Sequence, residues 1–216
     1  MTRRRAVLLT ALLVGFALVL AAVQSHWYPV RRLDLRIADD LHHAELRHPA
    51  QVSWWKWVSG VLSPDVLRIA AAGAAIGLWL SRRHRVALLV VVTMAGAWLL
   101  EVTTKALVGR DRPAFAHPVA HAPGAAFPSG HAMTSIVALG LLVLLVPGLR
   151  VVAAAVGGLA VALVGFSRLA LGVHYLTDVV GGWLLGAAWL VGIDGVFMSG
   201  DGRDDPDATP LLQPDL

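Results

Sequence analysis

Long apolar runs alternate with short polar segments along this sequence. The first run extends without a charged residue from Ala6 to Val23, directly after Arg3, Arg4 and Arg5. As a helix it would be about 27 Å long, close to the roughly 30 Å thickness of the hydrocarbon core of a bilayer. The apolar region of a signal peptide is usually shorter, so this run predicts an uncleaved first membrane span.

Further apolar runs predict five more membrane-spanning helices. Their expected ranges are 64–80, 86–108, 129–146, 151–166 and 179–198. Ser63, Pro64 and Asp65 form a typical helix start, with an N-cap, a proline at the first helical position and an acid in the first turn. Residues 109–128 contain glycine and several prolines and predict a loop, and residues 167–178 are expected to form a linker.

The polar segment from 24 to 62 predicts a helix on the membrane surface. Val30, Leu33, Ile37 and Leu41 recur at helical spacing, opposite a charged face. A cluster of tryptophans follows, as is common at the membrane–water interface. The cluster is Trp54, Trp55 and Trp57. The histidines of this segment, His42, His43 and His48, are interpreted as solvated loop residues and not as metal ligands.

Composition supports an integral membrane protein of the all-α class. Apolar residues make up 57% of the 216 residues and charged residues 15%, and the mean hydropathy is +0.68. Soluble domains have about 25% charged residues. The expected organisation is a six-helix membrane domain over 1–198, with a short amphipathic surface helix in its first external loop, and a disordered acidic tail over 199–216. The net charge of +4 does not form a basic face for nucleic acid, and the absence of cysteine excludes thiolate chemistry.

With six spans, the polar motifs of the chain would all lie on one side of the membrane. The end of the third span, the start of the fourth, the exit from the fifth and the entry to the sixth share that side. The arginine clusters Arg3–Arg5 and Arg82–Arg85 flank the opposite side. The positive-inside rule therefore predicts cytoplasmic termini and a motif-bearing side that faces outside, in the plasma membrane.

Lys105 and Arg112 are the cations of the first motif. Ionisable groups near a bilayer are costly and usually functional. An arginine can donate to two phosphate oxygens through its planar fork, and a lysine acts as a mobile point charge. Lys105 alone could also be a residue that extends to the interface. Glu101, one turn earlier, is expected to pair with Lys105.

The second motif, 128–131, opens the fourth span with Ser129, Gly130 and His131. Free N–H groups in the first turn and the helix dipole make an anion site. The Ser129 hydroxyl is expected either to cap this helix or to donate to an oxyanion. A capped helix alone has no need for the imidazole of His131.

The third motif, 167–178, contains Arg168, His174 and Asp178. A carboxylate four residues after a histidine can fix the imidazole tautomer, so that the other ring nitrogen serves as a base, metal ligand or nucleophile. Arg168 adds a second guanidinium for phosphate oxygens. A rival metal site of Asp111, His117 and His121 is disfavoured, because these residues lie in a segment rich in proline and glycine.

The ordered triplet of motifs at 105–113, 128–131 and 167–178 resembles the signature of the type 2 phosphatidic-acid phosphatase superfamily, which includes vanadium haloperoxidases and bacterial acid phosphatases. The resemblance implies that His174 attacks phosphorus to form a phosphohistidine, that Asp178 orients it, and that His131 protonates the leaving oxygen and then activates water. It also implies that further residues hold the phosphoryl oxygens. These are Lys105, Arg112, Ser129, Gly130 and Arg168.

The function expected from this resemblance is metal-independent hydrolysis of a lipid phosphate or diphosphate, either phosphatidate-type or a polyprenyl diphosphate such as undecaprenyl diphosphate. No cofactor is expected, and the partners are the lipid substrate and the bilayer. A phosphotransferase with a non-water acceptor, a non-catalytic membrane protein and, with bound vanadate, a haloperoxidase are the alternatives. Because His174 must be neutral and His131 charged, we expect a bell-shaped pH–rate profile.

Overall fold

The computed structural model describes residues 2–200, which form a helical bundle without any strand in that range. The helices are α1 (Arg3–Gln24), α2 (Tyr28–Arg47), α3 (Pro49–Val61), α4 (Pro64–Leu80), α5 (His84–Val108), α6 (Gly130–Leu145), the 3₁₀ helix η1 (Pro147–Leu149), α7 (Arg150–Ala170) and α8 (Leu176–Gly200). The all-α class is therefore confirmed. Of the tail predicted over 199–216, residues 201–216 lie outside the described part, and 199–200 belong to α8.

Local signals in the sequence account for several helix ends. The Ser63 hydroxyl accepts a hydrogen bond from the Val66 N–H at 3.3 Å and caps α4, as predicted. Gly109 ends α5 in the left-handed conformation, with φ 61°, and its N–H donates to the Lys105 carbonyl.

The predicted linker 167–178 is wrong, because most of it is helical. Helix α7 continues to Ala170 and α8 begins at Leu176, so the connection between them is only 171–175. The Ser167 hydroxyl donates to the Val164 carbonyl one turn back at 2.7 Å. Its polar group is thus satisfied within the helix and does not end it.

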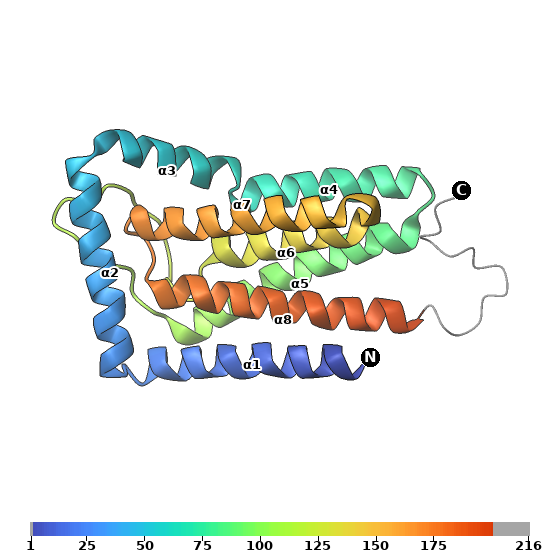
Figure 1. Cartoon of the computed structure of the whole chain (residues 1–216), viewed down its shortest axis with the longest axis horizontal. Coiled ribbons are helices and arrows are strands. Elements are labelled where there is room, and N and C mark those ends of the chain that lie inside the picture. Colours follow the sequence, from blue (N-terminus) through green and yellow to red (C-terminus); the bar gives the residue numbers. More distant parts are fainter. Residues whose placement is uncertain (1, 201–216) are drawn as a thin grey trace.

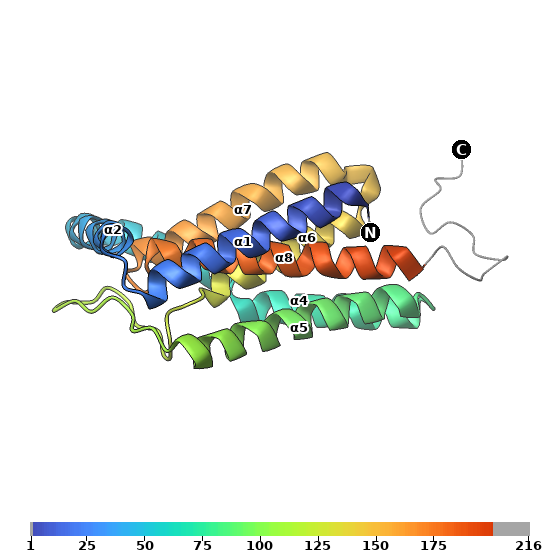
Figure 2. The ribbon, with the colours of Figure 1, turned by 90° about the horizontal axis from the view of Figure 1, so that it is seen from below.

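Helix α6 lies at the centre of the bundle (Figure 1). It packs against α7 and α8 and also contacts α4 and α5. Its inner side chains form a core with α5 and α8, which includes Met94, Met133 and Val137. Figure 2 shows α4 and α5 together on one side of this core, with α1 and α7 on the other. The N-terminus of α6, which carries the second motif, therefore starts inside the bundle.

Five helical stretches in residues 2–200 are long and apolar enough to cross a membrane. They are Arg3–Gln24, Pro49–Leu80, His84–Val108, Pro147–Ala170 and Leu176–Gly195, and α6 is apolar but shorter. Large apolar side chains such as Leu18, Ile76 and Val151 point away from the bundle and are more than 60% exposed. An outer surface of this kind suits a lipid environment. A sixth span through α6 stays a prediction.

Helix α2 crosses one end of the bundle at a steep angle to the other helices, and α3 returns along its side (Figure 1). The predicted amphipathic helix lies within α2, and Val30, Ile37 and Leu41 of its apolar face are half-buried, but Asp34 of the expected charged face points inward. The side chain of Asp34 is only 1% exposed, whereas Leu33 is 48% exposed. The buried stripe of α2 is Asp34, Ala38, His42 and Glu45, so the prediction of His42 as a solvated loop residue is wrong. The carboxylate of Asp34 points inward because Arg110 and Thr177, its hydrogen-bond partners, lie on that side.

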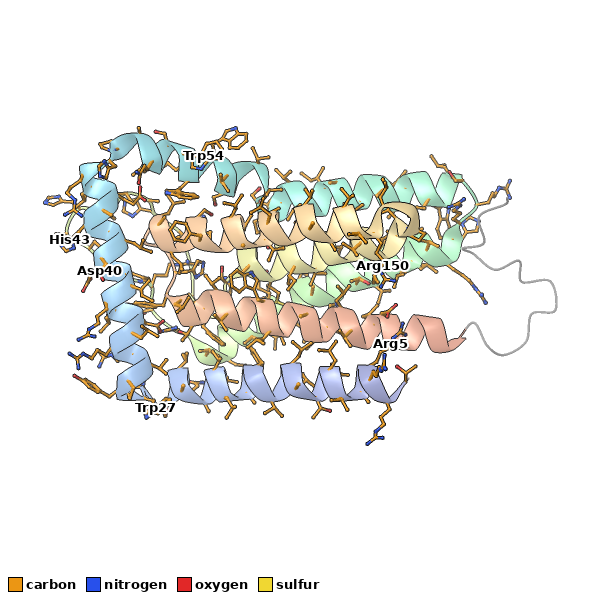
Figure 3. The ribbon with its side chains drawn as sticks, viewed as in Figure 1. Arg5, Trp27, Asp40, His43, Trp54 and Arg150 are labelled. Carbon is orange, nitrogen blue, oxygen red and sulfur yellow. The ribbon has the colours of Figure 1, made fainter. Side chains whose placement is uncertain are left out.

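The two ends of the bundle differ in chemistry. Figure 3 shows Arg5 and Arg150 toward one end, and Trp27, Asp40 and His43 at the other, where α2 lies. Arg5 forms an ion pair with Asp194 at 3.1 Å, which ties the start of α1 to α8 at the end opposite α2. The three motifs gather at the α2 end.

Gly182 permits the close approach of α8 to the start of α6. A Cβ atom built there would lie 2.6 Å from the Ser129 carbonyl oxygen, so α6 would have to shift. We expect Gly182→Ala to lower the free energy of unfolding by about 1–3 kcal/mol, and to reduce activity because Ser129 belongs to the second motif. Thermal unfolding in detergent measures the first effect.

Gly158→Ala in α7 is the matched control, because nothing lies within 4 Å of the added methyl group. Alanine is favoured over glycine in a helix interior by about 1 kcal/mol, so this variant should be neutral or more stable. Equal stability of Gly182→Ala and the wild type would show that the contact between α6 and α8 is not as tight as described.

Candidate active site

The first motif places one cation on a helix and one on a loop. The Lys105 ammonium lies in the last turn of α5, 3.3 Å from the Glu101 carboxylate, which confirms the predicted pairing. Glu101 also accepts from Arg68 of α4 at 3.0 Å. Arg68 and Lys105 thus share one carboxylate at the α2 end of the bundle, and Glu101 fixes the position of the Lys105 charge.

Arg112 lies in the loop after α5, where backbone carbonyls hold its guanidinium. It donates to the carbonyls of Pro123, Gly124, Ala125 and Val173 at 2.7–3.2 Å. Its Nη1 also lies 3.0 Å from Nε2 of His174. The carbonyls of the loop and of Val173 together hold the guanidinium of Arg112 at a fixed place beside the imidazole.

The second motif forms the buried N-terminus of α6. Ser129 is the N-cap residue, but its side chain makes no capping bond. Its hydroxyl is fully buried and has no hydrogen-bond partner within the described residues. Of the two roles left open for this hydroxyl, capping is therefore not used. A Cβ at Gly130 would lie 2.1 Å from the Glu101 Oε1 atom, so the Glu101 side chain, which pairs with Lys105, would have to move.

The third motif supplies the imidazole and its carboxylate. Nδ1 of His174 lies 3.5 Å from Oδ2 of Asp178, which is longer than a normal hydrogen bond, and it has no other partner in the described residues. Oδ2 also accepts the Tyr175 N–H at 2.8 Å, so the carboxylate is fixed to the start of α8. Burial lowers the pKa of His174 to about 4, although the Asp178 carboxylate opposes the shift. The imidazole is therefore neutral at pH 7.

Arg168 is in the last turn of α7, and its side chain is held by α3. Its Nη1 donates to the Ser59 hydroxyl. Its Nε is buried and has no partner in the described part of the chain. A buried guanidinium N–H without a partner is costly, so this group is suited to a ligand oxygen.

The three motifs converge as the sequence predicted. The Ser129 N–H donates to the Asp178 carbonyl at 2.9 Å, which joins the second motif to the third, and Arg112 joins the first motif to the third. His131 lies within electrostatic range of Lys105, Arg168 and His174. All the predicted site residues thus belong to one cluster at the α2 end of the bundle.

Two residues of this cluster were not predicted as site residues. Arg110 is ion-paired with Asp178 and also with Asp34 of α2, at 2.5 and 2.7 Å. In the sequence, Asp34 and Arg110 each lie among several other charged residues, and nothing there distinguishes them from their neighbours. A cavity of about 400 Å³ opens beside this pair, between the end of α1, the start of α2 and the residues after α5.

The arrangement suits a phosphoryl group. Three guanidinium or ammonium groups, a free hydroxyl and the N-terminus of α6 surround a neutral imidazole with an oriented carboxylate. Such preorganised donors stabilise the charge of a phosphoryl group in its transition state. In the described residues, no group of three or more His, Cys, Asp or Glu side chains is placed to hold a metal ion. Asp111, His117 and His121 are exposed in the loop and form no such group.

Known proteins resemble this chain in both sequence and fold. The model of the PAP2 superfamily matches residues 86–196. Phosphatidylglycerophosphatase B of Bacillus subtilis (strain 168) is 35% identical over 135 residues, which are 59% of this chain and 64% of that protein. The crystal structure of a transmembrane PAP2-type phosphatidylglycerolphosphate phosphatase from Bacillus subtilis superposes with a TM-score of 0.78 at 27% identity, and covers 88% of this chain and 96% of that chain.

The family model covers all three motifs, and the structural likeness covers more of the chain than the family model does. The all-helical membrane fold and the expected family are thus confirmed, and this chain belongs to the PAP2 superfamily.

Proposed function

We propose that this protein is a membrane lipid phosphatase that works through a phosphohistidine. The observation that carries this proposal is the environment of His174. One ring nitrogen faces the Asp178 carboxylate, and the other accepts from a guanidinium N–H, so Nε2 carries the lone pair. A neutral imidazole with its lone pair among phosphate-binding groups is equipped for nucleophilic attack on phosphorus.

In the first step, Nε2 of His174 attacks phosphorus, and the bond from phosphorus to the lipid oxygen breaks. His131 gives a proton to that oxygen. The Nδ1 proton stays between His174 and Asp178, which stabilises the positive charge on the phosphorylated ring. Arg112, which donates to Nε2 in this structure, keeps its place beside the imidazole and donates to a phosphoryl oxygen instead once the bond to phosphorus forms.

In the second step, water attacks the phosphohistidine, and the phosphorus–nitrogen bond breaks. His131, now neutral, takes the proton of the water. The remaining groups bind the phosphoryl oxygens in both steps. They are Lys105, Arg112, Ser129, Gly130 and Arg168. The free hydroxyl of Ser129 and the unpaired Nε of Arg168 support these roles.

Phosphatidylglycerophosphate is the first substrate to test, since the relatives of this chain are named for it. Its phosphate group can enter the site while its acyl chains stay in lipid beside the apolar helices. Phosphatidate and polyprenyl diphosphates share this division between headgroup and tail. The arginines at the bundle end opposite the site support an outward-facing site and cytoplasmic termini.

Purified protein in detergent with EDTA is expected to release phosphate from phosphatidylglycerophosphate, with weaker activity on some of the other lipid phosphates. Fixed cations supply the charge that Mg²⁺ provides in other phosphoryl-transfer enzymes. Phosphate assays with and without added Mg²⁺ check this. Activity that appears only with Mg²⁺ would contradict the metal-free mechanism, and no release from any lipid phosphate by folded protein would contradict the function.

The pH dependence of kcat/KM should show an acid limb well below the ordinary histidine range. The pKa of His174 in the free enzyme is about 4, so the neutral nucleophile is present above that pH and is lost as the pH falls through it. We expect a steep loss near pH 4 as the acid limb of a bell-shaped profile, with its alkaline limb set by the loss of the His131 proton. Return of an acid-treated sample to pH 7 controls for unfolding. A reversible acid limb near pH 6.5 would contradict a buried, neutral His174.

A further inference from the structure

Asp34 lies on α2, outside the three motifs, but its carboxylate reaches the start of α8. Oδ1 accepts the Thr177 N–H at 3.0 Å, and Oδ2 accepts from the Thr177 hydroxyl at 2.5 Å. Because Thr177 is in the first turn of α8, Asp34 satisfies an N–H group that has no partner within its own helix. A carboxylate of α2 thus fixes the turn of α8 that carries Asp178.

Arg110 connects Asp34 to Asp178. Its Nη2 donates to Asp34 at 2.7 Å, and its Nη1 donates to the Thr177 hydroxyl and to Oδ1 of Asp178. The guanidinium also lies over the ring of Tyr175, 4.4 Å from its centre. The planar fork of an arginine can bridge two carboxylates and stack on a ring at the same time, which a lysine cannot do.

Both carboxylate oxygens of Asp178 therefore accept hydrogen bonds from the protein before any substrate binds. Oδ1 is held by Arg110, and Oδ2 accepts the Tyr175 N–H and faces the imidazole of His174. If Arg110 lost its place, the carboxylate could turn about its own axis, and the orientation of the imidazole would no longer be fixed. Asp34 and Asp178 are 1% and 0% exposed, so water does not readily replace these contacts.

We propose that Asp34 and Arg110 are positioning residues for the phosphoryl-transfer reaction, and that they act on His174 through Asp178. The inference rests on the proposed roles of His174 and Asp178. It makes α2, the helix across the end of the bundle, a part of the active site and not only a surface element. Neither residue has to touch the substrate.

Two other roles for the pair make different predictions. If Asp34 and Arg110 only stabilise the fold, their loss lowers the melting temperature and the amount of active protein, with no specific dependence on Asp178. If Arg110 binds the phosphate directly, its loss raises KM. If the pair positions Asp178, kcat falls while KM stays nearly constant, and the effect needs an intact Asp178 carboxylate.

Asp34→Asn is the central variant, because asparagine keeps the shape and the acceptor for the Thr177 N–H but loses the ion pair with Arg110. We expect kcat for phosphatidylglycerophosphate in detergent to fall about tenfold to a hundredfold, with KM changed less than about threefold. Asp40→Asn is the matched control, since Asp40 is exposed on the outer side of the same helix (Figure 3). It should retain wild-type kcat.

A double-mutant comparison tests whether Asp34 acts through Asp178. In an Asp178→Asn background, the further change Asp34→Asn is expected to lower kcat less than about twofold, because the carboxylate that it positions is gone. Adding Arg110→Lys to Asp178→Asn should likewise lower kcat by less than about twofold. Full, multiplicative losses in the double variants would overturn the inference, and so would an unchanged kcat in Asp34→Asn.

These outcomes are separable from a failure of the proposed function. If Asp178→Asn alone retains wild-type kcat, the proposed role of Asp178 is wrong, and the inference falls with it. If Asp178→Asn is strongly impaired and Asp34→Asn is not, only the inference is wrong. Thermal unfolding of each variant in the same detergent shows whether a loss of kcat is due to unfolding.

Discussion

Replacing His174 by alanine is expected to reduce phosphate release from phosphatidylglycerophosphate by about 10⁴-fold or more, because the covalent intermediate cannot form. The imidazole is buried between Asp178 and Arg112, and no other histidine in the described residues has this environment. Steady-state phosphate assays in detergent measure the loss. Binding of substrate should persist, since the cations of the site remain.

His43→Ala is the matched control for this variant. His43 is exposed on the outer side of α2, where Nδ1 lies 2.7 Å from the Asp39 carbonyl (Figure 3). The control should have wild-type activity and the same melting temperature. Activity of His174→Ala within tenfold of the wild type would mean that the nucleophile is another group or water.

Loss of the His131 imidazole should be the second largest effect, and it should affect both chemical steps. We expect His131→Gln to lower kcat by about 10²–10⁴-fold with the lipid substrate, the usual range for a general acid–base group. The matched control is His121→Gln, in the exposed loop before α6, which should behave as the wild type.

The leaving group separates the two roles of His131. An aryl phosphate has a weakly basic leaving oxygen that needs little protonation, so the first step should recover in His131→Gln. The second step still lacks its base, and the phosphoenzyme should accumulate. Rapid-quench measurement of bound phosphate shows this directly. If the variant is equally slow with both substrates and no phosphoenzyme accumulates, His131 does not have the two roles assigned to it.

Much of the site could be predicted from the sequence because its residues lie at helix ends. Lys105 and Glu101 are four residues apart, and helical spacing alone places them side by side, as the structure confirms. The alternation of spans brings the ends of α5 and α7 and the starts of α6 and α8 to one end of the bundle. The motif residues on these helix ends, Lys105, Ser129, Arg168 and Asp178, are brought together in this way.

Asp34 and Arg110 could not be predicted in this way. Periodicity assigns the charged face of an amphipathic helix to solvent, and only the packing of α2 against the end of the bundle turns Asp34 inward. Arg110 lies in an irregular loop, where no period fixes the direction of a side chain. The role of Ser129 was also open, because a cap and an oxyanion donor look the same in a sequence, and only the missing capping bond distinguishes them.

The central claim is that phosphate passes through a covalent bond to His174. The most direct test is rapid quenching of the wild-type protein with phosphatidylglycerophosphate labelled in its terminal phosphate, followed by peptide mapping of the label. The account predicts a label that is stable in base and labile in acid, on the peptide that contains His174, and absent in His174→Ala. Steady turnover by the wild type without any bound label, or label on another residue, would contradict it.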